Sequence, residues 1–119
     1  MSSSIVQEKS FEFALQIISL YRTLCEKHHE YVMSKQLLRC GTSIGANVEE
    51  ALGGQSRSDF ISKMSIARKE ARETRYWLRL FQASRLADVD VSKELHAVED
   101  LLRMLTSLIK TTKENPGNS

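Results

Sequence analysis

The sequence predicts an all-α protein, an antiparallel up-down-up-down four-helix bundle. Apolar residues recur at gaps of three and four along four long stretches, which is the period of an amphipathic helix. The one proline, Pro116, lies after these stretches, and five glycines are too few for a turn-rich β protein. With 119 residues, of which 41% are hydrophobic and 27% charged, we expect a single domain over residues 1–119.

The first helix is expected at about residues 5–28. Ser4 precedes it, and Gln7 follows three residues later, which is the spacing of a capping box. Two adjacent apolar stripes give this helix a face broad enough to contact more than one neighbour. The first stripe is Val6, Phe13, Ile17, Leu20 and Leu24, and the second is Ala14, Ile18, Tyr21 and Cys25.

The second helix is expected at about residues 33–52, and Gly53 with Gly54 marks its end. Glycine inside a helix costs about 1 kcal/mol relative to alanine. Two internal glycines, four residues apart, therefore indicate a helix that a neighbouring backbone approaches closely. The expected structural motif of this helix, which includes a polar pair three residues apart, is Gly41, Ser43, Gly45, Asn47 and Glu50.

The third helix is expected at about residues 57–86, capped by Ser56, and carries the clearest heptad of the chain. The fourth is expected at about residues 91–113, capped by Asp90 or Ser92. The heptad seam of the third helix is Phe60, Met64, Ala67, Ala71, Thr74, Leu78 and Phe81.

The cysteine content favours the cytoplasm. Cys25 and Cys40 each lie on an apolar helix stripe and match no metal-binding spacing, so we expect reduced core thiols. Residues 1–4 carry no signal-peptide pattern, and no apolar run is long enough for a membrane span.

Sequence motifs for catalysis or cofactors are absent. No phosphate-binding glycine loop, dinucleotide fingerprint or zinc-protease motif occurs. Glu26 and His29 match the Glu-x-x-His spacing of di-iron bundles, but no second pair exists. We therefore expect no catalytic residue, no metal and no cofactor. The carboxylates of Glu49, Glu50, Glu70 and Glu73 are expected to pair with arginines rather than to act in acid–base chemistry.

The third helix carries the most prominent charge feature. Eight basic and three acidic residues lie between 57 and 86, although the net charge of the chain is only +2. At 100° per residue, five arginines fall within a strip about 60° wide, which could follow a phosphate backbone. The alternative is that these arginines pair with Glu49, Glu50 or Glu73, or with acids of an adjoining copy. The candidate nucleic-acid-binding residues are Arg57, Arg68, Arg72, Arg75 and Arg79.

Apolar residues that lie off the heptad seam predict self-association. One flank of the third helix, away from the arginines, is apolar and includes the single tryptophan, and the fourth helix carries a second apolar stripe. A wide core face is the alternative explanation for the tryptophan. The candidate oligomer-interface residues are Ile66, Trp77, Leu80, Leu101 and Leu108.

Residues 34–51 resemble the signature of four-helix-bundle proteins encoded by intervening sequences within bacterial 23S rRNA genes. Val48 stands where isoleucine is usual in that family, and parts of residues 59–74 resemble its third helix. The likeness extends from about residue 10 to residue 113. The matching residues of the second helix are Gln36, Leu37, Arg39, Ser43, Ile44, Ala46, Asn47, Glu50 and Ala51.

The resemblance implies an antiparallel bundle that assembles as a homopentameric ring and has no catalytic residues. A related branch, the accessory proteins of diversity-generating retroelements, is strongly basic and binds nucleic acid and a reverse transcriptase. This chain departs from that branch in its net charge of +2.

Two main hypotheses follow. The first is a non-enzymatic oligomer that uses the third-helix arginines to bind RNA, such as ribosomal RNA, or a ribonucleoprotein. No interaction with a membrane is expected. The second is a protein–protein scaffold in which those arginines serve in ion pairs. An enzyme centred on Glu50 and Glu73 is the least favoured alternative.

Overall fold

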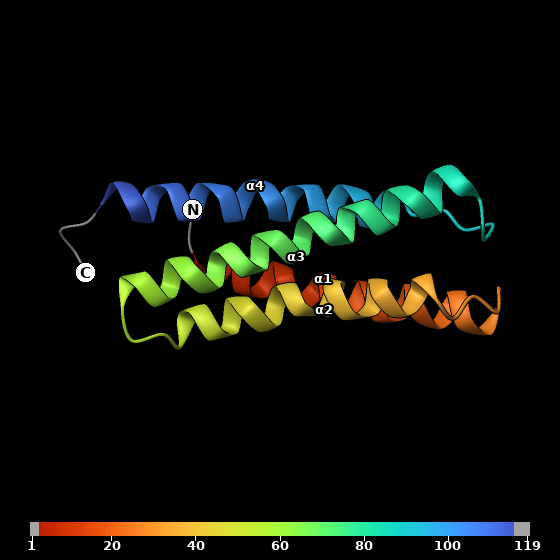
Figure 1. The fold of residues 1–119 in the computed structure, drawn as a ribbon, viewed down its shortest axis with the longest axis horizontal. Coiled ribbons are helices and arrows are strands. Elements are labelled where there is room, and N and C mark those ends of the chain that lie inside the picture. Colours follow the sequence, from red (N-terminus) through yellow and green to blue (C-terminus); the bar gives the residue numbers. More distant parts are fainter. Residues whose placement is uncertain (1–2, 116–119) are drawn as a thin grey trace.

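The structure is a computed structural model that describes residues 3–115, and these form four helices and no strand (Figure 1). Residues 1–2 and 116–119, which the expected domain 1–119 includes, lie outside the described residues. The all-α prediction is confirmed. No helix within 3–115 has the length and apolar character needed to cross a membrane. The helices are α1 (Ser3–Glu26), α2 (Met33–Leu52), α3 (Arg57–Ser84) and α4 (Ser92–Glu114).

Consecutive helices run antiparallel, and each helix packs against two others (Figure 1). α1 packs on α2 and α4, and α3 packs on α2 and α4. The bundle therefore has four sides, which we name by the two helices that form each one. The α1–α2 side and the α3–α4 side are opposite, whereas the α1–α2 and α2–α3 sides are adjacent and share α2.

The core is built from the main predicted stripe of each helix. The second stripe predicted for α1 is not part of it, because Ile18 is 40% exposed and Cys25, expected as a core thiol, is only partly buried. Phe13 and Ile17 of α1, Ile44 of α2 and Leu105 of α4 are all buried. The heptad seam of α3 is buried from its second residue onward, and only its first residue, Phe60, is partly exposed. The remaining members of that seam are Met64, Ala67, Ala71, Thr74, Leu78 and Phe81.

The two glycines of α2 allow α1 to approach closely, as predicted. A Cβ atom added at Gly41 would lie 2.9 Å from both Cγ1 and Cγ2 of Ile17. A Cβ atom at Gly45 would lie 3.3 Å from the carbonyl oxygen of Ser10, which belongs to the backbone of α1. A larger residue at either position would push the two helices apart.

The polar residues of the predicted motif bond within α2 itself. The Ser43 hydroxyl donates to the carbonyl oxygen of Arg39 at 2.6 Å, and the Asn47 amide donates to the carbonyl oxygen of Ser43 at 2.9 Å. Glu50 is exposed. The close packing of α2 therefore depends on its glycines rather than on the Asn47 and Glu50 side chains.

A carboxylate that the sequence analysis did not single out caps α2. Glu30 accepts hydrogen bonds from the backbone N–H groups of Val32, Met33 and Ser34 at 3.0, 3.1 and 2.7 Å. His29, with φ of 53°, turns the chain in the left-handed conformation. Because of this turn α1 ends at Glu26, two residues before the expected end at 28.

The predicted cap of α3 is present, since the Ser56 hydroxyl accepts a hydrogen bond from the Asp59 N–H at 3.0 Å. α3 ends at Ser84 rather than 86, because Arg85 takes the left-handed conformation with φ of 54°. Ahead of α4, the Asp90 carboxylate accepts hydrogen bonds from the N–H and the hydroxyl of Ser92 at 3.0 and 2.6 Å.

Candidate nucleic-acid interface

A groove of about 640 Å³ lies on the α3–α4 side of the bundle, and we call it the basic groove. Its walls carry four cationic side chains and one carboxylate, so its charge is strongly positive although the chain has a net charge of only +2. Two hydroxyl groups of α4 add neutral hydrogen-bond donors. The lining residues are Arg72, Arg75, Glu99, Leu102, Arg103, Thr106, Ser107 and Lys110.

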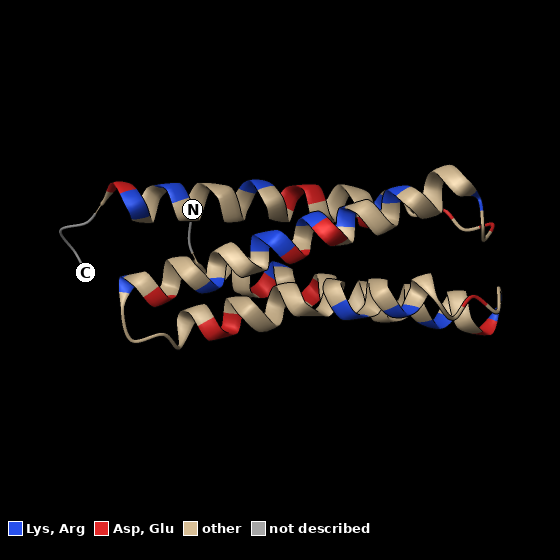
Figure 2. Cartoon of the chain, viewed as in Figure 1, with Lys and Arg blue, Asp and Glu red and all other residues tan. Residues whose placement is uncertain are grey.

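In the part of the chain that the structure describes, the guanidinium groups of the predicted arginine strip are unpaired. Within residues 3–115, none of Arg57, Arg68, Arg72, Arg75 and Arg79 forms an ion pair or a side-chain hydrogen bond. Figure 2 shows basic segments along the middle of α3 and along α4. The charges of Arg72 and Arg79, which are exposed, are therefore available to an external anion, whereas Nη1 of Arg57 is buried.

The carboxylates that the sequence offered as partners are engaged elsewhere. Arg39 of α2 reaches across to α3, where it pairs with Glu70 at 3.5 Å and with Glu73. Glu73 also accepts a hydrogen bond from the Trp77 indole at 3.2 Å. Gln7 of α1 donates to Glu49 at 2.9 Å. The sequence analysis favoured ion pairs with arginine over acid–base chemistry for these carboxylates. The structure shows such pairs for Glu70 and Glu73.

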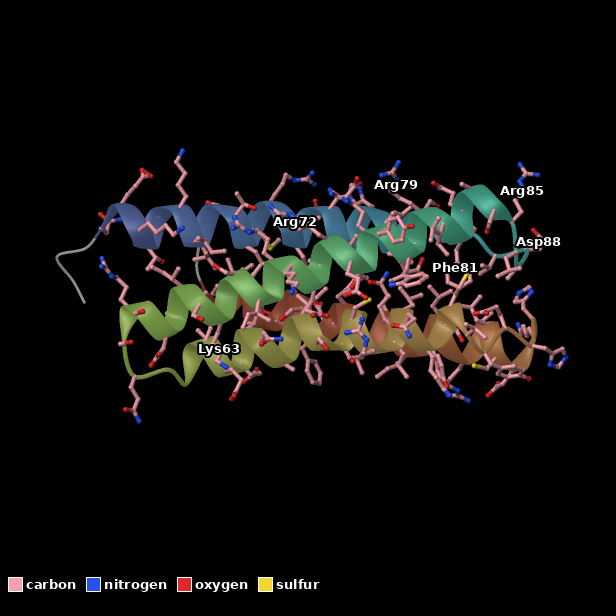
Figure 3. All side chains as sticks on the ribbon, viewed as in Figure 1. Lys63, Arg72, Arg79, Phe81, Arg85 and Asp88 are labelled. Carbon is pink, nitrogen blue, oxygen red and sulfur yellow. The ribbon has the colours of Figure 1, made fainter. Side chains whose placement is uncertain are left out.

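The structure brings only part of the strip into one groove. Arg72 and Arg75 line the basic groove, and Figure 3 shows Arg72 between α3 and α4, with Arg79 reaching toward the α4 side. Arg68 is partly buried, and it does not line this groove. Arg57 lies at the far end of α3, against Thr111 in a separate cavity of about 500 Å³.

The contribution of α4 was missed in the sequence analysis. Arg103, Thr106, Ser107 and Lys110 lie one or two turns apart on one face of α4, a spacing that the sequence does show. What the sequence lacks is the register of α4 against α3. Arg103 also forms an ion pair with Asp100 on its own helix, so part of its charge is already compensated.

A protein-family model described as "23S rRNA-intervening sequence protein" matches residues 2–107 of the chain. The chain belongs to this family. The resemblance inferred from residues 34–51 is thereby confirmed. Among proteins with curated functions, none matches the chain.

A solved structure also resembles the chain. It is described as a protein with unknown function from the S23 ribosomal protein family of Bacteroides thetaiotaomicron VPI-5482. The two sequences are 45% identical, the TM-score is 0.85, and the match covers 92% of this chain and 99% of that chain. The four-helix architecture of this 23S rRNA-intervening sequence family member thus has an experimentally determined counterpart.

The Glu-x-x-His pair of this family member is split between two elements. Glu26 is the last residue of α1 and pairs with Arg22 at 3.6 Å. His29 lies in the following turn, where its Nδ1 is 3.1 Å from the Tyr31 hydroxyl. Within the described residues, no group of three or more His, Cys, Asp and Glu side chains could hold a metal ion.

The predicted oligomer-interface residues fall into two sets. Leu101 and Leu108 are 2% and 8% exposed, so they are covered by their own chain and are not available to a second copy. The adjacent stripes of α4 are both buried because α4 packs against α1 on one side and α3 on the other. Ile66 is exposed, whereas Trp77 and Leu80 are partly buried at the surface of α3.

Proposed function

We propose that this member of the 23S rRNA-intervening sequence family is a non-enzymatic, self-associating bundle that binds RNA or a ribonucleoprotein through the basic groove. One observation carries the proposal. The guanidinium groups of Arg72 and Arg75 form no ion pair within residues 3–115, while nearby Glu70 and Glu73 are held by Arg39. With ribosomal RNA as the candidate ligand, the expected location is the cytoplasm.

The chemistry of the groove fits a phosphate backbone. Guanidinium groups bind phosphate oxygens through paired N–H donors, and each contact releases condensed counterions from the nucleic acid. The hydroxyls of Thr106 and Ser107 can donate to further phosphate or ribose oxygens. No aromatic side chain lines the groove, so base stacking plays no part in the proposed binding.

Self-association would strengthen this binding. One groove with four cations and one carboxylate offers few phosphate contacts. Several copies held in one assembly would present several grooves to the same RNA, and linked sites raise the overall affinity without new kinds of contact. The family resemblance supports a pentameric ring as the form of that assembly.

The proposal is tested by RNA retention on the immobilised protein. The variant in which Arg72, Arg75 and Arg79 are all changed to Gln should lose most of its salt-sensitive retention of ribosomal RNA. Its circular dichroism should match wild type, since Arg72 and Arg79 are exposed and none of the three forms an ion pair within the described residues.

A matched control removes the same charge elsewhere. Changing Lys27, Lys35 and Lys93 to Gln also lowers the net charge by three, but these lysines do not line the basic groove. This control should retain RNA as wild type does. Equal losses in both variants, or no salt-sensitive retention by wild type, would refute the proposed role of the groove.

An exposed apolar surface on α1 favours a second candidate function, a protein–protein scaffold. Phe11 and Leu15 are 63% and 54% exposed, which is unusual for large apolar residues that serve no contact. Pull-down from native lysate distinguishes the two functions. Proteins that stay bound after nuclease treatment support the scaffold, whereas nuclease-sensitive binding supports RNA.

A further inference from the structure

The basic groove contains one carboxylate, that of Glu99 on α4. Glu99 is exposed, and within residues 3–115 its side chain forms no ion pair and no hydrogen bond. The Arg103 guanidinium, one turn further along α4, pairs with the neighbouring Asp100 instead. The Glu99 carboxylate is thus an acceptor open to a ligand, in a groove whose other charged side chains are all cations.

Glu99 lies at one end of the groove. Lys110, which lines the other end of the α4 wall, follows eleven residues later, and this is roughly 16 Å along a helix. Thr106 follows Glu99 by seven residues, so the two side chains leave α4 in directions that differ by only about 20°. Because α3 runs antiparallel to α4, Arg75 lies nearer than Arg72 to the Glu99 end (Figure 1). The groove therefore places an acceptor beside a row of cationic and hydroxyl donors.

A carboxylate is unfavourable in a groove whose ligand offers only phosphate groups. Phosphate oxygens are anionic acceptors, so the Glu99 carboxylate repels them. The carboxylate becomes favourable where the ligand also brings a hydrogen-bond donor, and in RNA that donor is the ribose 2′-hydroxyl, which DNA lacks. Base amino groups are donors too, but no aromatic side chain lines the groove to hold an unstacked base.

We propose that Glu99 makes the basic groove select RNA over DNA, by accepting a hydrogen bond from a ribose 2′-hydroxyl while the α3 arginines hold neighbouring phosphates. The inference rests on the RNA binding of the proposed function and names the residue that decides between the two nucleic acids. With DNA, the carboxylate would face the backbone without a donor to satisfy it. Selectivity comes from this penalty as well as from the contact with RNA.

The other polar side chains of the groove do not make this distinction. Arg72 and Arg75 contact phosphates, which RNA and DNA share, so they set the affinity for both. The hydroxyls of Thr106 and Ser107 donate and accept, so they can bind phosphate and ribose alike. Of the side chains that line the groove in the described part of the chain, Glu99 alone accepts hydrogen bonds without donating them.

The test compares the binding of three fluorescent hairpins of one sequence, made of RNA, 2′-O-methyl RNA and DNA, by anisotropy. The 2′-O-methyl group cannot donate a hydrogen bond, so this hairpin separates the loss of the donor from the different helix shape of DNA. Wild type should bind RNA about tenfold more tightly than 2′-O-methyl RNA, because a hydrogen bond to a charged group is lost. DNA should bind more weakly than RNA by at least the same factor.

The Glu99→Ala variant should bind RNA and 2′-O-methyl RNA within about twofold of each other, because the acceptor is gone. Its affinity for DNA should rise above that of wild type, since the repulsion of phosphates is gone as well. Circular dichroism should match wild type, because Glu99 is exposed and has no partner within the described residues.

Two controls separate selectivity from charge and from affinity. Asp88→Ala removes the same charge from the loop between α3 and α4, where Asp88 is exposed and does not line the basic groove (Figure 3). This variant should keep the preference for RNA. Arg72→Gln should weaken the binding of all three hairpins by the same factor, because phosphate contacts do not distinguish ribose from deoxyribose.

The outcomes separate this inference from the proposed function. The role of Glu99 would be overturned if wild type bound RNA and 2′-O-methyl RNA equally, if Glu99→Ala kept the preference, or if Asp88→Ala lost it too. RNA binding by the groove would still stand in those cases. The absence of salt-sensitive binding of any hairpin to wild type would instead overturn the proposed function, and the role of Glu99 with it.

Discussion

Gly41 provides the most direct test of the close packing between α1 and α2. In a Gly41→Ala variant, the new methyl carbon would lie 2.9 Å from Cγ1 and Cγ2 of Ile17, which is too close for carbon atoms. Overpacking a core of this kind costs about 2 kcal/mol. Replacing glycine by alanine within a helix returns about 1 kcal/mol. We therefore expect the free energy of unfolding to fall by about 1 kcal/mol.

The assay is urea unfolding at a fixed protein concentration, followed through the fluorescence of Trp77, the single tryptophan. A second background isolates the steric contact. Ile17→Ala alone should destabilise by about 3 kcal/mol, because it leaves a cavity in the core. Adding Gly41→Ala to it should then stabilise by about 1 kcal/mol, since the contact is gone and the helix propensity gain remains.

The coupling between the two positions is thus expected to be about 2 kcal/mol in a double-mutant cycle. A Gly41→Ala variant as stable as wild type would refute the steric argument. The same would follow if the substitution had an equal effect in both backgrounds, because that would show no contact between residue 41 and Ile17.

Three further predictions concern a titration, a thiol and a helix cap. Hydrogen bonds from the hydroxyl and N–H of Ser92 hold the pKa of the Asp90 carboxyl below its ordinary value of 3.8. The resulting stabilisation is present above pH 3.8 and is lost as the pH falls through the lower pKa of the folded state. In urea titrations, the Asp90→Asn variant should therefore lose less stability than wild type between about pH 5 and pH 2. Burial raises the pKa of the Cys40 thiol, so a thiol reagent at pH 8 should modify the half-buried Cys25 first, and equal rates would contradict the structure. Ser56→Ala removes the cap of α3 and should lower the free energy of unfolding by about 1 kcal/mol, a loss that Ser56→Asp should largely restore.

The sequence predicts the helices and the core because those depend on local periodicity. The seam of α3 is buried from Met64 to Phe81, as its heptad indicates. The cap at Ser56 follows from a fixed spacing along the chain. The cap of α2 does not follow from such a spacing. Glu30 reaches the backbone of Ser34 only through a turn at His29, and no pattern in the sequence predicts that turn.

The candidate site could be predicted only in part, because it depends on how the helices lie against each other. The arginine strip is visible from α3 alone, but Lys110 joins it only through the register of α4. Periodicity likewise cannot show which apolar stripes the other helices cover. Leu101 and Leu108, which the sequence favoured for an interface, are therefore buried. Phe11 and Leu15, which the sequence did not favour for an interface, are exposed.

The salt dependence of binding to a ribosomal RNA fragment tests the basic groove most directly. For each phosphate contact, the slope of log binding constant against log salt concentration is about −0.7 to −0.9. Changing both Arg72 and Arg75 to Gln should therefore make the slope shallower by about 1.5 for each groove that engages the RNA. A wild-type slope near zero, or a slope unchanged by the double substitution, would contradict the account.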